Sequence, residues 1–127
     1  MKDRKKLIRI LDSLVKEYVI LRDKCCVVCG EADKKILASG HYFSRYHLAT
    51  RFDLKNNNCQ CHVCNARHEE DIKPYKFYMI GKYGKAFLEE LEIKKNKITI
   101  VKTWELETLR DYLKIEIEEL KKHLNAI

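Results

Sequence analysis

The 127-residue sequence contains one proline, four glycines and no long run of hydrophobic residues. A membrane-spanning helix needs about 18 consecutive apolar residues, so their absence argues against a transmembrane protein. The first residues, MKDRKKLIRILDSL, also lack the apolar block of a secretory signal peptide. No internal repeat or low-complexity tract is visible, and the length suits one domain with a single core. We therefore expect a cytoplasmic protein of one domain that does not contact a membrane.

Acidic residues are in the minority, with 19 Asp and Glu against 26 Lys and Arg, and the net charge is +7. The surplus is uneven, because residues 1–24 contain eight basic and four acidic side chains, whereas residues 103–127 contain four basic and six acidic ones. Such a surplus predicts a polyanionic partner such as DNA. The alternative is that the lysines only keep a helical protein in solution.

Helical periodicity dominates the chain. Apolar residues recur at intervals of three and four over residues 3–22, which predicts an amphipathic helix. Further helices are expected after Cys61, from Pro74 to about residue 80, over residues 85–95, and from an N-cap at Thr103 nearly to the end. Short strands are predicted over residues 36–43 and 50–54, and a brief extended segment over residues 97–102. The expected fold class is α+β and mostly helical.

The last helix, expected over residues 103–125, leaves two arrangements open. Its apolar positions recur in threes and fours, at Leu106, Leu109, Leu113, Ile117, Leu120 and Leu124. A seam of this kind packs either on the first helix or against a second copy of the chain. The second arrangement would make the protein a homodimer through this helix.

Six cysteines are present, and thiols stay reduced in the cytoplasm, so metal binding explains them better than disulfides do. Cys26 and Cys29 form one Cys-x-x-Cys pair and Cys61 and Cys64 another, with 31 residues between the pairs. Four thiolates at this spacing predict a structural Zn²⁺ site. Because four cysteine ligands leave no free coordination position, any chemistry must come from neighbouring residues. The two other cysteines are expected to be small buried hydrophobic residues.

The segment between the pairs carries His41 and Asn56, and Asn65 directly follows the second pair. A strand with His, a second strand leading to Asn, and a helix with a metal-binding Asn resemble the ββα-metal, or HNH, nucleases. In that chemistry a neutral His41 activates water as the general base, and Mg²⁺ or Mn²⁺ stabilises charge on the phosphate. Asn56 would hold the loop and orient the histidine ring. Taken singly, each residue also has a structural explanation, as a hydrogen-bonded histidine, a turn residue and a helix N-cap.

Longer motifs resemble one family more closely. GHYFSRYHLATRF, NNNCQCHVCN and PYKFYMIGKYG, followed by an acidic terminal helix that begins at a tryptophan, are similar to the phage lambda NinG (Rap) family of recombination nucleases. The resemblance extends from residue 25 to the end. It implies a structure-specific endonuclease that cuts branched DNA, such as Holliday junctions and D-loops, with Mg²⁺ or Mn²⁺, in the host cytoplasm if the gene is a phage gene. The expected organisation is a basic helix (residues 1–24), a zinc-bound HNH-like core (25–72) and a helical region (73–127).

Gly40 departs from the HNH pattern, in which an Asp or His before the catalytic His often binds the metal. Asn65 is therefore expected to hold the catalytic metal. The missing ligand could be replaced by Glu69, one helical turn further on, by Asp53, His47 or His68, or by water and substrate phosphate.

Basic side chains near the expected hairpin would contact the phosphates that flank the scissile bond; these are Arg45, His47, Arg51, Lys55 and Arg67. The basic stretches at residues 2–9 and 73–85 would hold the arms of a branched substrate. Two alternatives stay open: a non-catalytic zinc-stabilised DNA-binding protein, and a zinc-clamped module that binds other proteins.

Overall fold

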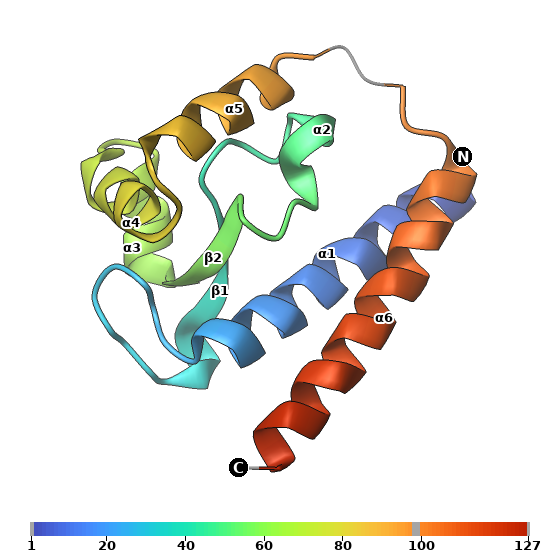
Figure 1. Ribbon diagram of the computed structural model, residues 1–127, viewed down its shortest axis with the longest axis horizontal. Helices are drawn as coiled ribbons and strands as arrows, with labels where there is room; N and C mark the ends of the chain where they lie inside the picture. Colours follow the sequence, from blue (N-terminus) through green and yellow to red (C-terminus); the bar gives the residue numbers. More distant parts are fainter. Residues whose placement is uncertain (1, 98–99, 127) are drawn as a thin grey trace.

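The computed structural model describes residues 2–97 and 100–126. Its helices are α1 (Lys2–Asp23), α2 (Leu48–Arg51), α3 (His62–His68), α4 (Lys73–Tyr83), α5 (Lys85–Lys95) and α6 (Thr103–Asn125), and a 3-10 turn, η1, covers Lys34–Ile36 (Figure 1). The strands are β1 (Leu37–His41) and β2 (Asn57–Cys61). The predicted α+β, mostly helical fold class is confirmed.

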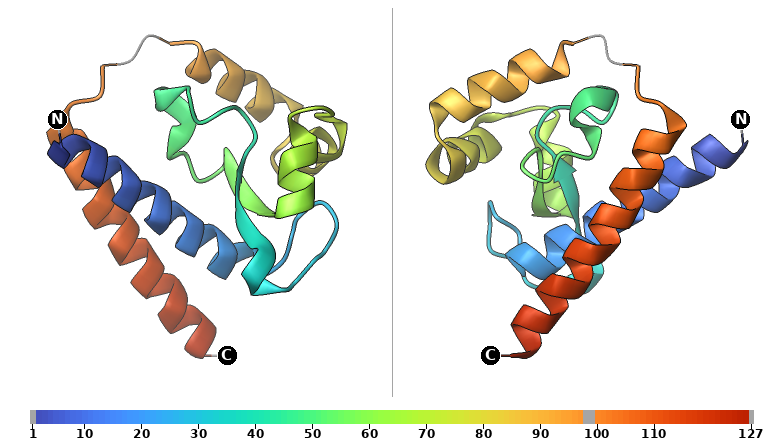
Figure 2. Two further views of the ribbon diagram at one scale, coloured as in Figure 1. Left: turned by 180° about the vertical axis from the view of Figure 1, so that it is seen from behind. Right: turned by 45° about the vertical axis from the view of Figure 1, so that its right-hand side comes forward.

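The two long helices, α1 and α6, lie side by side and run in the same direction (Figures 1 and 2). Leu11 of α1 and Leu106 and Leu113 of α6 are buried in one core cluster. Burying a leucine side chain contributes about 1.5–3 kcal/mol, so this seam is a major source of stability. Of the two arrangements left open, packing on the first helix is therefore the one observed. A dimer would have to use other residues of α6.

The two strands form an antiparallel hairpin in which Leu37 pairs with Cys61 and His41 pairs with Asn57. Both α1 and α3 contact the two strands, and α3 begins directly where β2 ends. The chain between residues 37 and 68 therefore has the order strand, one-turn helix α2, strand, helix, with His41 at the end of the first strand.

The second strand was predicted at the wrong place. Residues 50–54 contain the end of α2 and a turn, and β2 instead covers Asn57–Cys61, in which all five residues are buried. An asparagine-rich segment is a poor strand former by composition. Here loop carbonyls satisfy its side chains, since Asn58 Nδ2 donates to Lys55 O at 3.0 Å and Asn57 Nδ2 donates to Asp53 O at 2.8 Å. These contacts override the local preference.

The remaining helices build a second core cluster beside the hairpin, consisting of Tyr42, Tyr75, Met79, Leu88 and Leu91. The helices predicted from Pro74 and over residues 85–95 are confirmed, although α4 extends to Tyr83. The N-cap of α6 is Lys102 rather than Thr103. In the segment predicted to be extended, residues 98 and 99 lie outside the described residues, and residues 100–102 form no strand. None of the helices in the described parts of the chain is long and apolar enough to cross a membrane.

Candidate metal centre and catalytic cleft

Four cysteines from two separate segments meet at one end of the hairpin. The sulfur atoms of Cys26, Cys29, Cys61 and Cys64 all lie within 4.8 Å of one another, and Cys29 Sγ is 3.6 Å from Cys61 Sγ. Sulfurs held tetrahedrally at about 2.3 Å from a zinc ion would lie about 3.8 Å apart. The four cysteines can therefore hold a structural metal such as zinc, in agreement with the predicted pairing.

Backbone N–H groups around the sulfurs favour the metal-binding thiolates. The N–H of Cys29 donates to Cys26 Sγ, and the N–H of Cys64 donates to Cys61 Sγ, each at 3.5 Å. Burial opposes ionisation of Cys26, but the backbone N–H groups of Cys29, Cys61 and Val28 outweigh it and lower the pKa of Cys26 to about 7. A thiolate is the form that coordinates zinc.

The turn after α1 brings the first pair to the second. Gly30 adopts a φ of 84°, which favours glycine, and its N–H donates to Cys26 O at 2.9 Å. Val27 N donates to Cys59 O at 2.8 Å, which attaches this turn to β2. Cys59 itself is fully buried outside the cluster, and burial raises its pKa to about 12. The expected hydrophobic role is confirmed for Cys59, whereas Cys25 is partly exposed.

His41 lies at the end of β1 with one ring nitrogen engaged. Its Nε2 is 3.0 Å from Arg51 O. Because a carbonyl oxygen can only accept, Nε2 carries the proton and Nδ1 keeps its lone pair. Burial lowers the pKa of His41 below its ordinary value, against the opposing effect of the hydrogen bond to Arg51 O. The imidazole is therefore neutral at pH 7, which is the form that a general base requires.

Asn57, rather than Asn56, shares a partner with His41. Asn57 Nδ2 donates to Arg51 O at 3.0 Å, and Asn57 Oδ1 accepts from the hydroxyl of Ser39 at 3.0 Å. The amide therefore fixes the carbonyl to which the His41 ring is bonded. Orientation of the ring, predicted for Asn56, belongs in this geometry to its neighbour.

Asn56 holds the loop instead, as the other half of its predicted role required. Its Oδ1 accepts from Phe43 N at 2.9 Å, and its Nδ2 donates to Phe43 O at 3.0 Å and to Thr50 O at 3.1 Å. All three contacts close the loop between β1 and β2 onto itself. The fully buried Asn56 therefore fixes the path of the chain immediately after His41.

A cleft of about 610 Å³ beside β1 brings His41 together with Asn65 and Glu69. Asn65 lies in α3, and Glu69 is the C-cap of the same helix, one turn further on. The other lining residues are Ser39, Tyr42, Ser44, Arg45, Tyr46 and His68. A neutral base, an amide, a carboxylate and a guanidinium thus surround one space. Oxygen ligands of this kind suit a hard divalent cation.

A second cavity continues on the other side of His41. It has a volume of about 170 Å³ and shares Ser39, His41 and Arg45 with the larger cleft. Its opposite wall is formed by residues of α1, namely Asp12, Val15 and Lys16. No sequence pattern predicts that α1 lies against the site, because periodicity shows which face of a helix is buried but not what covers it.

The space beside the Cα atom of Gly40 is filled by the side chain of Gln60. A Cβ at this position would overlap the amide oxygen of Gln60 and would lie 2.7 Å from its Cδ. Gly40 also lies between Ser39 and His41, so its own side faces away from the cleft that those residues line. A metal ligand at residue 40 is therefore excluded by packing, and the glycine is required by Gln60.

The other suggested metal ligands do not all reach the cleft. Asp53 Oδ2 pairs with Lys94 Nζ at 2.8 Å, and Asp53 is not among the residues that line the cleft. His47 lies at the N-cap of α2 and does not line it either. Among the side chains suggested as partners of Asn65, the geometry retains Glu69 and His68.

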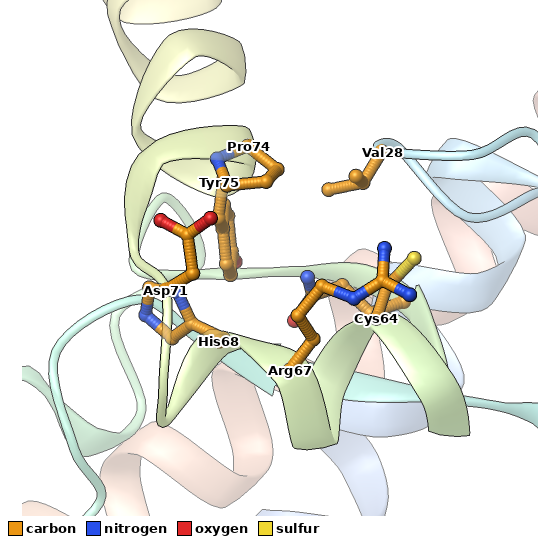
Figure 3. Close-up of a pocket in the computed structure, with 8 residues that line it drawn as sticks. Val28, Cys64, Arg67, His68, Asp71, Pro74 and Tyr75 are labelled. Carbon is orange, nitrogen blue, oxygen red and sulfur yellow. The ribbon is translucent and has the colours of Figure 1, made fainter.

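His68 is held in place by two tyrosines. Its Nε2 donates to Tyr42 O at 2.7 Å, and its ring centroid lies 5.2 Å from that of Tyr42 and 4.9 Å from that of Tyr75. Figure 3 shows the His68 ring next to Tyr75 and close to Asp71, in a small cavity between α3 and the start of α4. His68 therefore fastens α3 to the end of β1. In the sequence, the spacing of three residues between Asn65 and His68 indicates that both side chains lie on the same face of α3.

Two residues predicted to bind DNA have partners within the chain. The guanidinium of Arg51 makes two contacts with the Asp12 carboxylate, at 3.1 and 2.7 Å. Lys55 Nζ lies 4.9 Å from the centroid of the Phe87 ring. Arg67 lines the small cavity of Figure 3 rather than the cleft. Of the predicted phosphate contacts, only Arg45 lines the cleft that contains His41 and Asn65.

The fold and these sites define a mostly helical α+β protein with a four-cysteine cluster that can hold a metal, next to a cleft lined by histidines. A family model described as Bacteriophage Lambda NinG protein matches residues 1–123. The chain therefore belongs to this family, as its motifs predicted.

Individual relatives match a smaller part of the chain. It is 31% identical over 77 residues to Protein ninG of Escherichia phage 933W and 30% identical over 77 residues to Protein ninG of Escherichia phage lambda, and each match covers 60% of this chain and 38% of the relative. Identity to Protein ninG of Salmonella phage P22 is 33% over 72 residues, or 56% of this chain and 36% of that protein. The matches thus span less than two fifths of these curated relatives. No solved structure matches the chain.

Proposed function

We propose that the protein is a metal-dependent DNA endonuclease of the HNH type that cuts branched DNA, with His41 as the general base. The observation that carries the proposal is the cleft itself, which a neutral His41 lines together with Asn65 and Glu69, while its Nε2 rather than its Nδ1 is bonded to Arg51 O. The hairpin of β1 and β2 followed directly by α3, with the short α2 between the strands, supports it, since HNH nucleases build their site on two strands and a helix.

The chain supplies most of the reaction through His41. Nδ1 takes a proton from a water molecule as the water oxygen bonds to phosphorus, and the bond from phosphorus to the leaving oxygen then breaks. The hydrogen bond from Nε2 to Arg51 O keeps the ring oriented and stabilises the imidazolium that forms. Arg45, exposed at the edge of the cleft, positions the substrate phosphate.

Asn65 and Glu69 would hold the catalytic Mg²⁺ or Mn²⁺ through their side-chain oxygens. Such an ion stabilises charge on the phosphate and on the leaving oxygen when it is bound. Because two protein ligands are few, water and substrate phosphate would complete its coordination, as is usual for magnesium. The four cysteines are closed to this chemistry and fix the fold around it.

The test is cleavage of a labelled four-way junction and a matched linear duplex, with Mg²⁺, with Mn²⁺ and with EDTA. We expect cutting of the junction only with a divalent ion, and at least a 100-fold loss of rate in His41→Ala, since general-base catalysis contributes about 10²–10⁴. His123→Ala, which removes an exposed histidine from α6, should cut normally. Zinc content and junction binding should not change in either variant. Full cleavage by His41→Ala would overturn the assignment.

A non-catalytic zinc-stabilised DNA-binding protein is the second candidate. Glu69 is the only carboxylate among the described residues that line the cleft, and a single carboxylate is a weak anchor for a divalent ion. Tight junction binding without cleavage in any divalent metal would favour this reading.

A further inference from the structure

One face of α1 carries basic side chains that no internal contact uses. Lys5, Arg9 and Lys16 are exposed, and none of them makes a hydrogen bond or ion pair with another described residue. Their spacing of four and seven residues places all three on one stripe of the helix. By contrast, Arg4 and Arg22 of the same helix bond to the backbone of other segments.

This stripe begins at the catalytic cleft. Lys16 lines the 170 Å³ cavity that shares His41 and Arg45 with the larger cleft. Asp12 also lies on this side of α1, but its carboxylate is paired with Arg51 at 2.7 Å, so its negative charge is offset locally. From Lys16 the stripe extends towards the N-terminus of α1 over eleven residues, which is about 16 Å of helix.

The stripe lies to one side of the acidic helix α6. Residues of α1 that line the cavity towards α6 are Asp3, Lys6, Leu7 and Ile10, and Glu17 pairs with Lys121 of α6 at 3.2 Å. Positions 5, 9 and 16 lie roughly a third of a turn away from that side. A polyanion on the stripe would therefore avoid the acidic side chains of α6.

We propose that Lys5, Arg9 and Lys16 form the surface that holds one duplex arm of the DNA, as a continuation of the cleft beyond His41. The inference rests on the proposed function for the identity of the polyanion. A length of about 16 Å corresponds to about five base pairs at 3.4 Å each, so the arm lies along α1 while its end enters the cleft. Backbone contacts of this kind position the duplex without reading its sequence.

The test compares the variant Lys5→Ala/Arg9→Ala/Lys16→Ala with the control Lys6→Ala/Lys114→Ala/Lys122→Ala. Both remove the same charge from exposed positions, but the control residues lie on α6 or on the side of α1 that faces it. Binding to a fluorescent junction and to a linear duplex is measured by anisotropy without divalent metal, at several NaCl concentrations. Circular dichroism checks that both variants fold.

For the stripe variant we expect the slope of log affinity against log salt to become shallower by up to about 2.7, since each phosphate contact contributes about 0.9. Near 0.1 M salt this corresponds to a loss of affinity of up to about 500-fold. The control should keep the wild-type slope, and Lys5→Arg/Lys16→Arg should too, because it retains the charges. Equal losses in the stripe variant and the control would overturn the inference, as would an unchanged slope.

The outcome is separable from that of the nuclease proposal. If the wild-type protein binds DNA through the stripe but never cuts it, the proposed surface is supported and the proposed catalysis is contradicted. If cleavage depends on His41 but binding is unchanged in the stripe variant, the proposed catalysis is supported and the proposed surface is contradicted. A chain that binds no DNA under any condition would overturn both, as would binding only to an acidic peptide.

Discussion

Replacing Asn57 with alanine should destabilise the protein and disturb His41, whereas its sequence neighbours should act differently. Asn57 is fully buried, and its side chain makes three hydrogen bonds, two to loop carbonyls and one from Ser39. Removing one partner of a buried hydrogen bond costs about 1–3 kcal/mol. The lower figure applies here, because Arg51 O keeps its bond to His41, and Asp53 O still accepts from the Asn56 N–H. The expected loss is therefore about 3 kcal/mol.

The assay is equilibrium unfolding in urea with one equivalent of zinc, read by circular dichroism. Ser39→Ala removes one of the three bonds and should cost about 1 kcal/mol, while Asn96→Ala, at an exposed helix end, should stay within about 0.5 kcal/mol of wild type. Ser39→Ala shows how much one of the three hydrogen bonds contributes to stability, and Asn96→Ala shows that substitution of an asparagine alone does not destabilise the protein.

The second readout is the pKa of His41, measured by NMR of its ring protons. Burial is the main cause of the lowered pKa, so the cavity left by Asn57→Ala should admit water and raise the pKa towards its ordinary value. A stability loss below about 1 kcal/mol with an unchanged His41 pKa would refute the role assigned to Asn57. So would a His41 response to Asn56→Ala alone.

Three further outcomes are expected. Metal analysis of the purified protein should find one zinc ion per chain. Cys61→Ser should lose this ion and Cys59→Ala should keep it, because Cys61 belongs to the cluster and Cys59 does not. Gly40→Ala should lower the free energy of unfolding in urea by about 1–3 kcal/mol, because the new Cβ overlaps Gln60. In a Gln60→Ala background the same substitution should cost less, and strictly additive effects would contradict the packing argument. The pKa of His41 is lower in the folded chain than its unfolded value of about 6.5. The contribution of His41 to stability is therefore fully present above pH 6.5 and is lost as the pH falls through the folded pKa. The cleavage rate should fall over the same pH range, because protonated His41 cannot act as a base.

The helices and the metal ligands could be predicted because both leave local patterns. Apolar residues at intervals of three and four define the buried face of α1 and α6, and Cys-x-x-Cys pairs are typical of structural zinc sites. The same pattern could not decide what lies on that face, so the choice between α1 and a second copy of the chain needed the structure.

The position of β2 and the division between Asn56 and Asn57 could not be predicted, for a common reason. Both side chains bond to backbone N–H and C=O groups of the loop over residues 43–55, whose path is set by tertiary packing. Without that loop, three consecutive asparagines are typical of a turn. Likewise, the HNH pattern indicates only a missing metal ligand at Gly40, because no local signal reveals that Gln60 lies over it.

The strand β2 links the two candidate sites mechanically. Asn57 at one end fixes the carbonyl that orients His41, and Cys61 at the other end belongs to the metal cluster, four residues or about 13 Å away. α3 provides a second link, because Asn65 directly follows Cys64 in the same helix. Loosening the cysteine cluster would therefore release β2 and α3 together, and with them both the orientation of the base and the position of Asn65. Loss of zinc should abolish order at His41 even while the α1 and α6 pair, which buries its own leucine seam, is still helical.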